Sequence, residues 1–138
     1  MRYYKQQVLW FSGARMPKTA VRIYKEKDGS APLCDWLDGL SAKVQDKCIA
    51  RVELLAGYGH QLRRPVCDYL DNGIYELRVR YNNVNYRILY CFVGKDIVLL
   101  SHGCTKEQKV PRIEIERAVR NRANYIKNPA AHSCDEEL

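Results

Sequence analysis

The chain has 138 residues, of which 46% are hydrophobic and 28% charged, so its length suits one domain and its composition excludes wholesale disorder. No apolar run approaches the roughly 18 residues of a membrane-spanning helix, and the patch at residues 8–11 is shorter than the roughly 7–15 residues at the centre of a secretory signal. We therefore expect a cytoplasmic protein with no membrane partner. The net charge of +7 suits a polyanion such as nucleic acid or the ribosome, although an ordinary soluble basic surface accounts for the charge equally well.

The six cysteines stand singly along the chain, without the CxxC spacing or the nearby histidines of a zinc site. In a reducing compartment such residues are free thiols, and several serve as small core side chains. The sequence therefore predicts no metal site and no cofactor.

The N-terminal half predicts a strand followed by a helical hairpin. Residues 1–18 have no clear periodicity and are expected to be an extension, whereas residues 19–25 alternate as a strand does. Ser30 is the expected N-cap of a short helix, and Ser41 the N-cap of a longer one. Gly57 and Gly59 follow the longer apolar stripe and are expected to end that helix.

From residue 66 the apolar period changes from helical to alternating, which favours an antiparallel meander with short turns. The expected strands cover residues 66–70, 74–81, 84–93 and 96–102. A last helix follows Pro111, with an apolar stripe of Ile115, Ala118, Val119 and Ile126.

The fold class that these elements predict is α+β, with two N-terminal helices packed on a small antiparallel sheet and a C-terminal helix. The domain is expected to cover residues 19–127. The remaining residues, 128–138, carry acidic but no basic side chains and are expected to form a mobile tail.

Strand alternation places three charged side chains, Glu76, Arg78 and Arg80, on one face of the strand at residues 74–81. If the next turn has two residues, Arg78 faces Arg87 on the neighbouring strand. A second two-residue turn would place His102 opposite Arg87, with Lys106 just beyond, so that a row of cations crosses three strands.

Two arginines that face each other across a sheet repel, whereas a favourable cross-strand pair contributes roughly 0.2–1 kcal/mol. An anion between Arg78 and Arg87 explains their pairing, and a phosphate suits two guanidinium groups especially well. The alternative is that both arginines point into water or pair with Glu76.

Three consecutive stretches carry a family resemblance: GIYELRVR, then NYRILYCFV, then DIVLLSHGCTKEQKVPRIEIERA. Their order and spacing resemble the phage-derived HigB-like branch of the RelE/ParE toxin superfamily, over roughly residues 19–127. The resemblance implies the RelE-like fold, an antitoxin partner that is expected to be a helix-turn-helix protein of the HigA type, and cleavage of mRNA in the ribosomal A site.

By that resemblance, the ribose 2′-hydroxyl attacks the adjacent phosphate without a metal. Arg78 and Arg87 would stabilise the charge on the phosphoryl oxygens, and Lys106 would serve the leaving oxygen. His102 is the first candidate for the general base and Glu76 the second, although each has a structural alternative as a hydrogen-bonded or ion-paired residue. Contacts with the RNA backbone are expected from Arg80 and Lys109.

The segment at residues 102–111 departs from the pattern of the branch. It is one residue shorter, has Cys104 where an aromatic residue is usual, and has Glu107 where a second lysine is usual. Two other functions therefore stay open: a ParE-like poison of DNA gyrase, and a non-catalytic relative that binds RNA or a partner.

Overall fold

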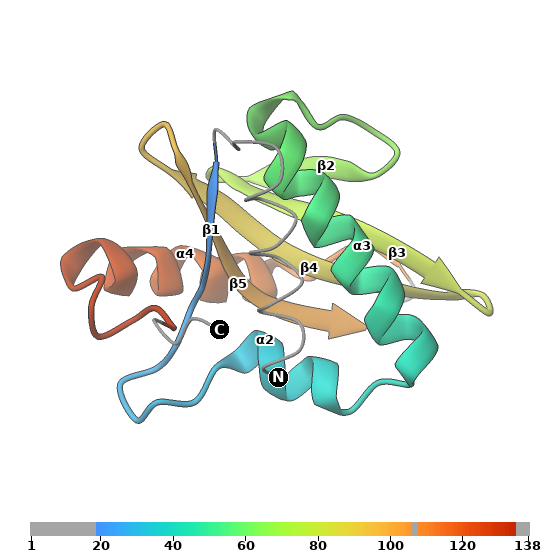
Figure 1. The fold of residues 1–138 in the computed structure, drawn as a ribbon, viewed down its shortest axis with the longest axis horizontal. Helices are drawn as coiled ribbons and strands as arrows, with labels where there is room; N and C mark the ends of the chain where they lie inside the picture. Colours follow the sequence, from blue (N-terminus) through green and yellow to red (C-terminus); the bar gives the residue numbers. More distant parts are fainter. Residues whose placement is uncertain (1–18, 106–107, 135–138) are drawn as a thin grey trace.

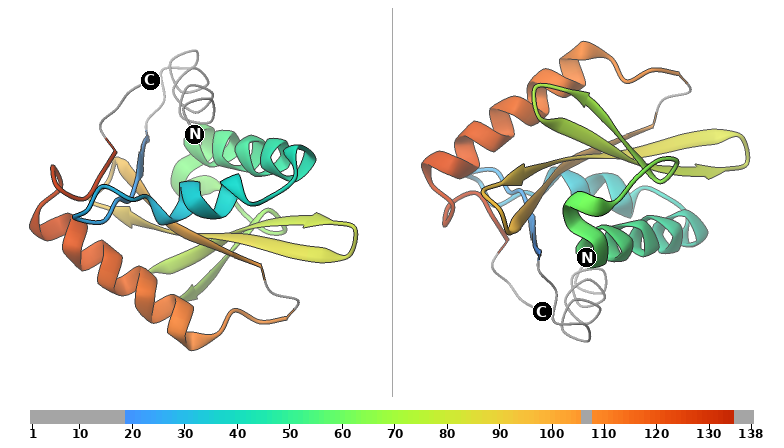
Figure 2. Two further views of the ribbon diagram at one scale, coloured as in Figure 1. Left: turned by 90° about the horizontal axis from the view of Figure 1, so that it is seen from below. Right: turned by 90° about the horizontal axis from the view of Figure 1, so that it is seen from above.

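The computed structural model of the protein describes residues 19–105 and 108–134, so the expected N-terminal extension lies outside the described residues. The α+β fold is confirmed: α2 and α3 cover one face of the sheet and α4 covers the other (Figures 1 and 2). In chain order the elements are β1 (Ala20–Ile23), α2 (Pro32–Asp38), α3 (Ala42–Tyr58), the 3-10 turn η1 (Gly59–Gln61), β2 (Cys67–Asp71), β3 (Ile74–Tyr81), β4 (Val84–Val93), β5 (Ile97–Thr105) and α4 (Arg112–Lys127).

The sheet has five strands in the order β1-β5-β4-β3-β2. The pairs from β2 to β5 are antiparallel, as predicted. In contrast, β1 runs parallel to β5, so the expectation of a wholly antiparallel sheet is wrong at this edge. The chain between these two strands includes both N-terminal helices and three strands, which is ample length for a parallel return.

The helical hairpin forms where the periodicity predicts it, but only one of its predicted caps is present. Ser41 Oγ accepts a hydrogen bond from Val44 N at the start of α3. Gly59, with a φ of 53°, ends that helix, whereas Gly57 lies inside it. Ser30 does not cap α2. Its hydroxyl and its backbone N–H both bind the carboxylate of Asp28, and α2 begins at Pro32, a residue suited to the first turn.

The β3–β4 hairpin has the predicted register, because Asn82 and Asn83 form a two-residue turn with both φ angles positive. The turn between β4 and β5 differs. Three residues separate Val93 from Ile97, and β5 contains an irregularity at which Ser101 is the extra residue. The predicted register of this pair is therefore shifted by one position between the turn and Tyr90, and by two positions from Leu89 to Tyr86.

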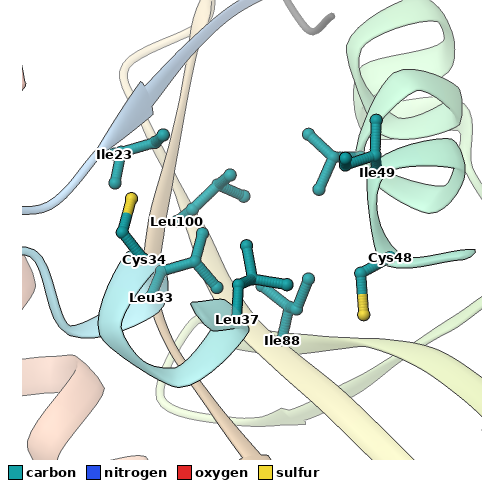
Figure 3. Close-up of a pocket in the computed structure, with 9 residues that line it drawn as sticks. Ile23, Leu33, Cys34, Leu37, Cys48, Ile49, Ile88 and Leu100 are labelled. Atoms are coloured by element: carbon teal, nitrogen blue, oxygen red, sulfur yellow. The ribbon is translucent and has the colours of Figure 1, made fainter. Parts of the chain in front are cut away.

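The core has one apolar cluster on each face of the sheet. Between α2, α3 and the sheet it leaves a hollow of about 20 Å³, close to the space that one water molecule occupies. Figure 3 shows its lining of aliphatic and thiol side chains, among them Ile23, Leu37, Cys48 and Leu100. The hollow is entirely apolar and belongs to the core.

Helix α4 buries Ile115, Ala118, Asn121 and Tyr125. The prediction for Ile126 is wrong, since this side chain is exposed; the polar Asn121, which donates to Ser101 Oγ, and the aromatic Tyr125 occupy the buried face instead. No helix in the described part of the chain is long and apolar enough to cross a membrane.

The segment after α4 packs against the first strand. Lys25 N donates to His132 O, Cys134 N donates to Ile23 O, and the imidazole of His132 stacks on Tyr24. Backbone hydrogen bonds and an aromatic contact thus join residues 128–134 to the first strand, and the mobility of the tail stays a prediction. Residues 135–138 lie outside the described part.

Candidate phosphate-binding site

Arg78 and Arg87 face each other across β3 and β4, as the hairpin register predicted. The alternation along β3 places Leu77 and Val79 in the cluster beneath α2 and α3, so the two arginines lie on the other face of the sheet, the face that α4 partly covers. The sequence thus predicted both the pairing and the shared face of these side chains.

Glu76 joins the two arginines. One carboxylate oxygen lies 2.8 Å from Arg87 Nε, and the other lies 2.9 Å from Arg78 Nε. The exposed fraction of the side chain is only 4% for Glu76 and 12% for Arg87, but 39% for Arg78. Both arginines therefore pair with Glu76, which was the alternative to an anion site. Of the two arginines, Arg78 is the more accessible to solvent.

A second carboxylate holds Arg78 from the neighbouring edge strand. Asp68 on β2 lies 3.0 Å from Arg78 Nη2 and 3.0 Å from Arg64 Nε. The pKa of Asp68 lies below its ordinary value, chiefly because Arg64 donates a hydrogen bond to it. Asp68 is thus ionised at neutral pH and fixes the outer end of Arg78.

A pocket of about 380 Å³ opens beside these side chains. It is lined by Arg51, Pro65, Arg78, Val79, Arg80, Asn85, Tyr86 and Arg87. Four of these residues are arginines, whereas two carboxylates, Glu76 and Asp68, pair with them. Because Asp68 also pairs with Arg64, positive charge exceeds negative charge among the described residues around this pocket, which favours an anionic ligand such as a phosphate.

His102 does not face Arg87, because the shifted register of β4 and β5 places Cys104 there and His102 opposite Leu89. Because side chains alternate along a strand, a shift of two positions keeps His102 on the α4 face. Its side chain is buried, with Nδ1 2.8 Å from Ser101 Oγ and Nε2 2.9 Å from Glu114 Oε1.

Burial lowers the pKa of His102 and the charge of Arg117 lowers it further, while the bond to Glu114 opposes both. The imidazole is therefore neutral at neutral pH. With both of its ring nitrogens engaged, His102 links β5 to α4, and the structure does not bring it together with the arginines.

Of the remaining predicted residues, Arg80 lines the pocket, Lys109 is not among the lining residues, and Lys106 lies outside the described part of the chain. Arg80 is exposed and donates to the amide oxygens of Asn85 and Asn83. Lys109 is exposed in the bend before α4. Lys106 directly follows β5 but lies outside the described residues, so its position relative to the pocket stays a prediction.

Sequence reasoning missed three charged residues of this site: Arg51, Arg64 and Asp68. The turn between β2 and β3 held a signal for Asp68, because it places this residue opposite Glu76. Arg51 comes from α3, and no local pattern connects a helix residue with a particular strand. Within residues 19–105 and 108–134 there is no group of three His, Cys, Asp or Glu side chains that could hold a metal ion.

One protein-family profile matches the chain. It is described as "Phage derived protein Gp49-like (DUF891)" and matches residues 35–123, which is more than half of the 138 residues. The matched region runs from α2 into α4 and includes all the charged residues that line or contact the pocket. No curated protein matches the chain significantly.

Proposed function

The chain belongs to this phage-derived Gp49-like family, which is part of the RelE/ParE-like toxin group, and from that membership we propose that it is a HigB-like toxin of a type II toxin–antitoxin system that cuts mRNA on the ribosome. The observation that carries the proposal is the pocket in which Arg78 and Arg87 face each other on one side of the sheet. Its partners would be the ribosome with its mRNA and a helix-turn-helix antitoxin of the HigA type.

The reaction is transfer of a phosphoryl group within the RNA. The 2′-oxygen of a ribose forms a bond to the adjacent phosphorus, and the bond from phosphorus to the 5′-oxygen of the next nucleotide breaks. The products are a 2′,3′-cyclic phosphate and a free 5′-hydroxyl. Arg78 and Arg87 stabilise the charge that grows on the phosphoryl oxygens, where removal of one well-placed donor costs roughly 10²–10³ in rate. No metal takes part.

Glu76 links substrate binding to proton transfer. In the structure its two oxygens are held by two guanidinium groups. A phosphate that approaches through the pocket competes for the same donors, first at Arg78, which is the more exposed of the two. The displaced carboxylate is then free to accept the proton of the 2′-hydroxyl, a role that typically contributes about 10²–10⁴-fold.

Lys106 is the proposed donor of the proton to the departing 5′-oxygen. It follows Thr105, the last residue of β5, which pairs with Tyr86 of the pocket lining. In this scheme the buried His102 is a positioning residue. Its hydrogen bond to Glu114 fixes the first turn of α4, the helix that follows the segment containing Lys106.

The test is inducible expression of the wild type beside Arg87→Lys, Arg87→Ala and a control, Arg22→Ala, in the distant strand β1. We expect the wild type and Arg22→Ala to arrest growth and to produce new 5′-hydroxyl ends within coding regions. Arg87→Ala should do neither. Arg87→Lys keeps the positive charge but not the fork of donors, and should retain a small part of the activity.

Two results would contradict the proposal. Growth without arrest in every strain, at equal levels of folded protein, would remove the toxin assignment. Growth arrest with intact transcripts would remove the nuclease, and inhibition of supercoiling by purified gyrase would then identify the ParE-like activity.

A further inference from the structure

Arg51 is the one lining residue of the pocket that comes from the helical layer. On α3 it stands three residues after Cys48 and four before Leu55, both of which are buried in the core beneath the helix. This spacing places Arg51 at the border of the buried stripe, where its aliphatic stem can pack while its guanidinium reaches the pocket. The pocket thus receives cations from both the sheet and the helix.

The four arginines of the lining divide into two pairs by their partners. Arg78 and Arg87 share the carboxylate of Glu76. For Arg51, residues 19–105 and 108–134 provide neither a carboxylate in ion-pair range nor a hydrogen-bond acceptor, and Arg80 binds only neutral amide oxygens, at 3.3 and 3.4 Å. The excess positive charge of the pocket therefore lies on Arg51 and Arg80.

We propose that Arg51 and Arg80 form a second phosphate subsite, which holds a phosphodiester next to the one that Arg78 and Arg87 bind. This inference rests on the proposed function and specifies its substrate: single-stranded RNA with at least two phosphates in the pocket. Arg51 and Arg80 bind and position the RNA and do not touch the reacting atoms.

The two subsites have separable effects. Loss of a phosphate contact weakens binding of every sequence to a similar degree and lowers the salt dependence of binding, by about 0.7 in the logarithmic slope for a single strand. Loss of Arg51 should thus raise KM and leave kcat nearly unchanged, whereas loss of Arg87 should lower kcat.

The experiment measures binding of two ligands that have no free 2′-hydroxyl and are not cut: a 2′-O-methyl pentanucleotide, and a 2′-O-methyl mononucleotide with one 3′-phosphate. The full chain is compared with Arg51→Met, which keeps an apolar stem, and with Arg51→Lys, Arg80→Gln and Arg87→Lys. Lys43→Met is the matched control, because Lys43 is an exposed cation on α3 that does not line the pocket. Thermal unfolding verifies that each variant is folded.

For the pentanucleotide, we expect Arg51→Met and Arg80→Gln to weaken binding roughly three- to tenfold at low salt and to lower the salt slope by about 0.7. Arg51→Lys should restore most of the affinity, and Lys43→Met should match the wild type. For the mononucleotide, which has one phosphate, only Arg87→Lys should weaken binding.

The subsite is overturned if Arg51→Met binds the pentanucleotide with the affinity and the salt slope of the wild type while Arg87→Lys binds it more weakly; the proposed function then stands. Stronger Arg51-dependent binding of a polyglutamate peptide would assign the pocket to an acidic protein segment instead of RNA. Failure of the wild type to cut mRNA in a translating extract, despite Arg51-dependent binding of the pentanucleotide, would remove the proposed function and keep the subsite.

Discussion

Replacement of Glu76 by glutamine tests the charge balance on which the site depends. The substitution keeps the shape of the side chain but leaves Arg78 and Arg87 facing each other without the carboxylate that now joins them. Removal of one partner from a buried ion pair costs about 3–5 kcal/mol. The cost should be lower here, about 2–3 kcal/mol, because Arg78 is 39% exposed and its share is screened by solvent.

Thermal and urea unfolding measure this loss. For a domain of this size, about 2–3 kcal/mol corresponds to a fall in Tm of about 6–15 °C. The control is Asp71→Asn, which breaks the ion pair with Arg112; the exposed fractions of those side chains are 62% for Arg112 and 44% for Asp71, so the expected change is at most about 0.5 kcal/mol.

Inorganic phosphate should partly restore the stability of the Glu76→Gln variant, because two facing arginines that have lost their carboxylate partner bind an oxyanion. At ten times its Kd, phosphate would add about 1.4 kcal/mol to the free energy of unfolding of the variant and much less to that of the wild type. If Glu76→Gln unfolds within about 0.5 kcal/mol of the wild type, or if phosphate stabilises both proteins equally, the carboxylate does not occupy a phosphate position.

Three further predictions concern the framework around the site. Burial lowers the pKa of His102, so the protein should lose stability as the pH falls below about 6.5, the ordinary pKa of histidine. The loss should be at most about 1.4 kcal/mol per pH unit. Unfolding measured across this pH range should show the loss in the wild type and in His60→Gln but not in His102→Gln. Gly103→Ala should destabilise the protein by roughly 1–3 kcal/mol in urea unfolding, because the added Cβ would overlap the indole ring of Trp36. The control is Gly39→Ala, whose Cβ has ordinary contacts, and it should change the stability little. Burial raises the pKa of Cys48 to about 12, so its thiol should resist alkylation at pH 8 until the protein is unfolded, and rapid labelling of the native protein would contradict its burial.

The part of the site that could be predicted from the sequence lies in a hairpin with a well-determined register. In β3 and β4 the apolar side chains alternate strictly, and the dipeptide between the strands is typical of a two-residue turn. These local features determine which residues face each other. Arg78 and Arg87 were therefore predicted as neighbours without any knowledge of the tertiary structure.

The register of β5 could not be predicted in the same way, because its irregularity depends on a tertiary contact. Ser101 is polar in an apolar strand, and its burial becomes favourable only through the hydrogen bonds with His102 and Asn121. Since the total shift is even, the predicted face of His102 was right while its predicted neighbour, Arg87, was wrong.

Contacts between layers account for the residues that were missed. Arg51 reaches the pocket from a helix, so its role depends on how α3 packs across the sheet. Likewise, the choice of Asn121 over Ile126 for the buried face of α4 depends on which acceptors lie beneath the helix. Periodicity locates a helix face to within one position, and packing determines the rest.

The edge of the sheet at β1 has a consequence for how the protein is made. Its parallel partner, β5, is synthesised only after both N-terminal helices, the 3-10 turn and three strands, and the hydrogen bond between Lys25 and His132 joins positions 107 residues apart. In contrast, Arg78 and Arg87 belong to a hairpin that can close locally. Loop closure of this length is slow compared with hairpin formation, so during translation the cationic hairpin should form early, while the first strand waits for almost the whole chain to leave the ribosome.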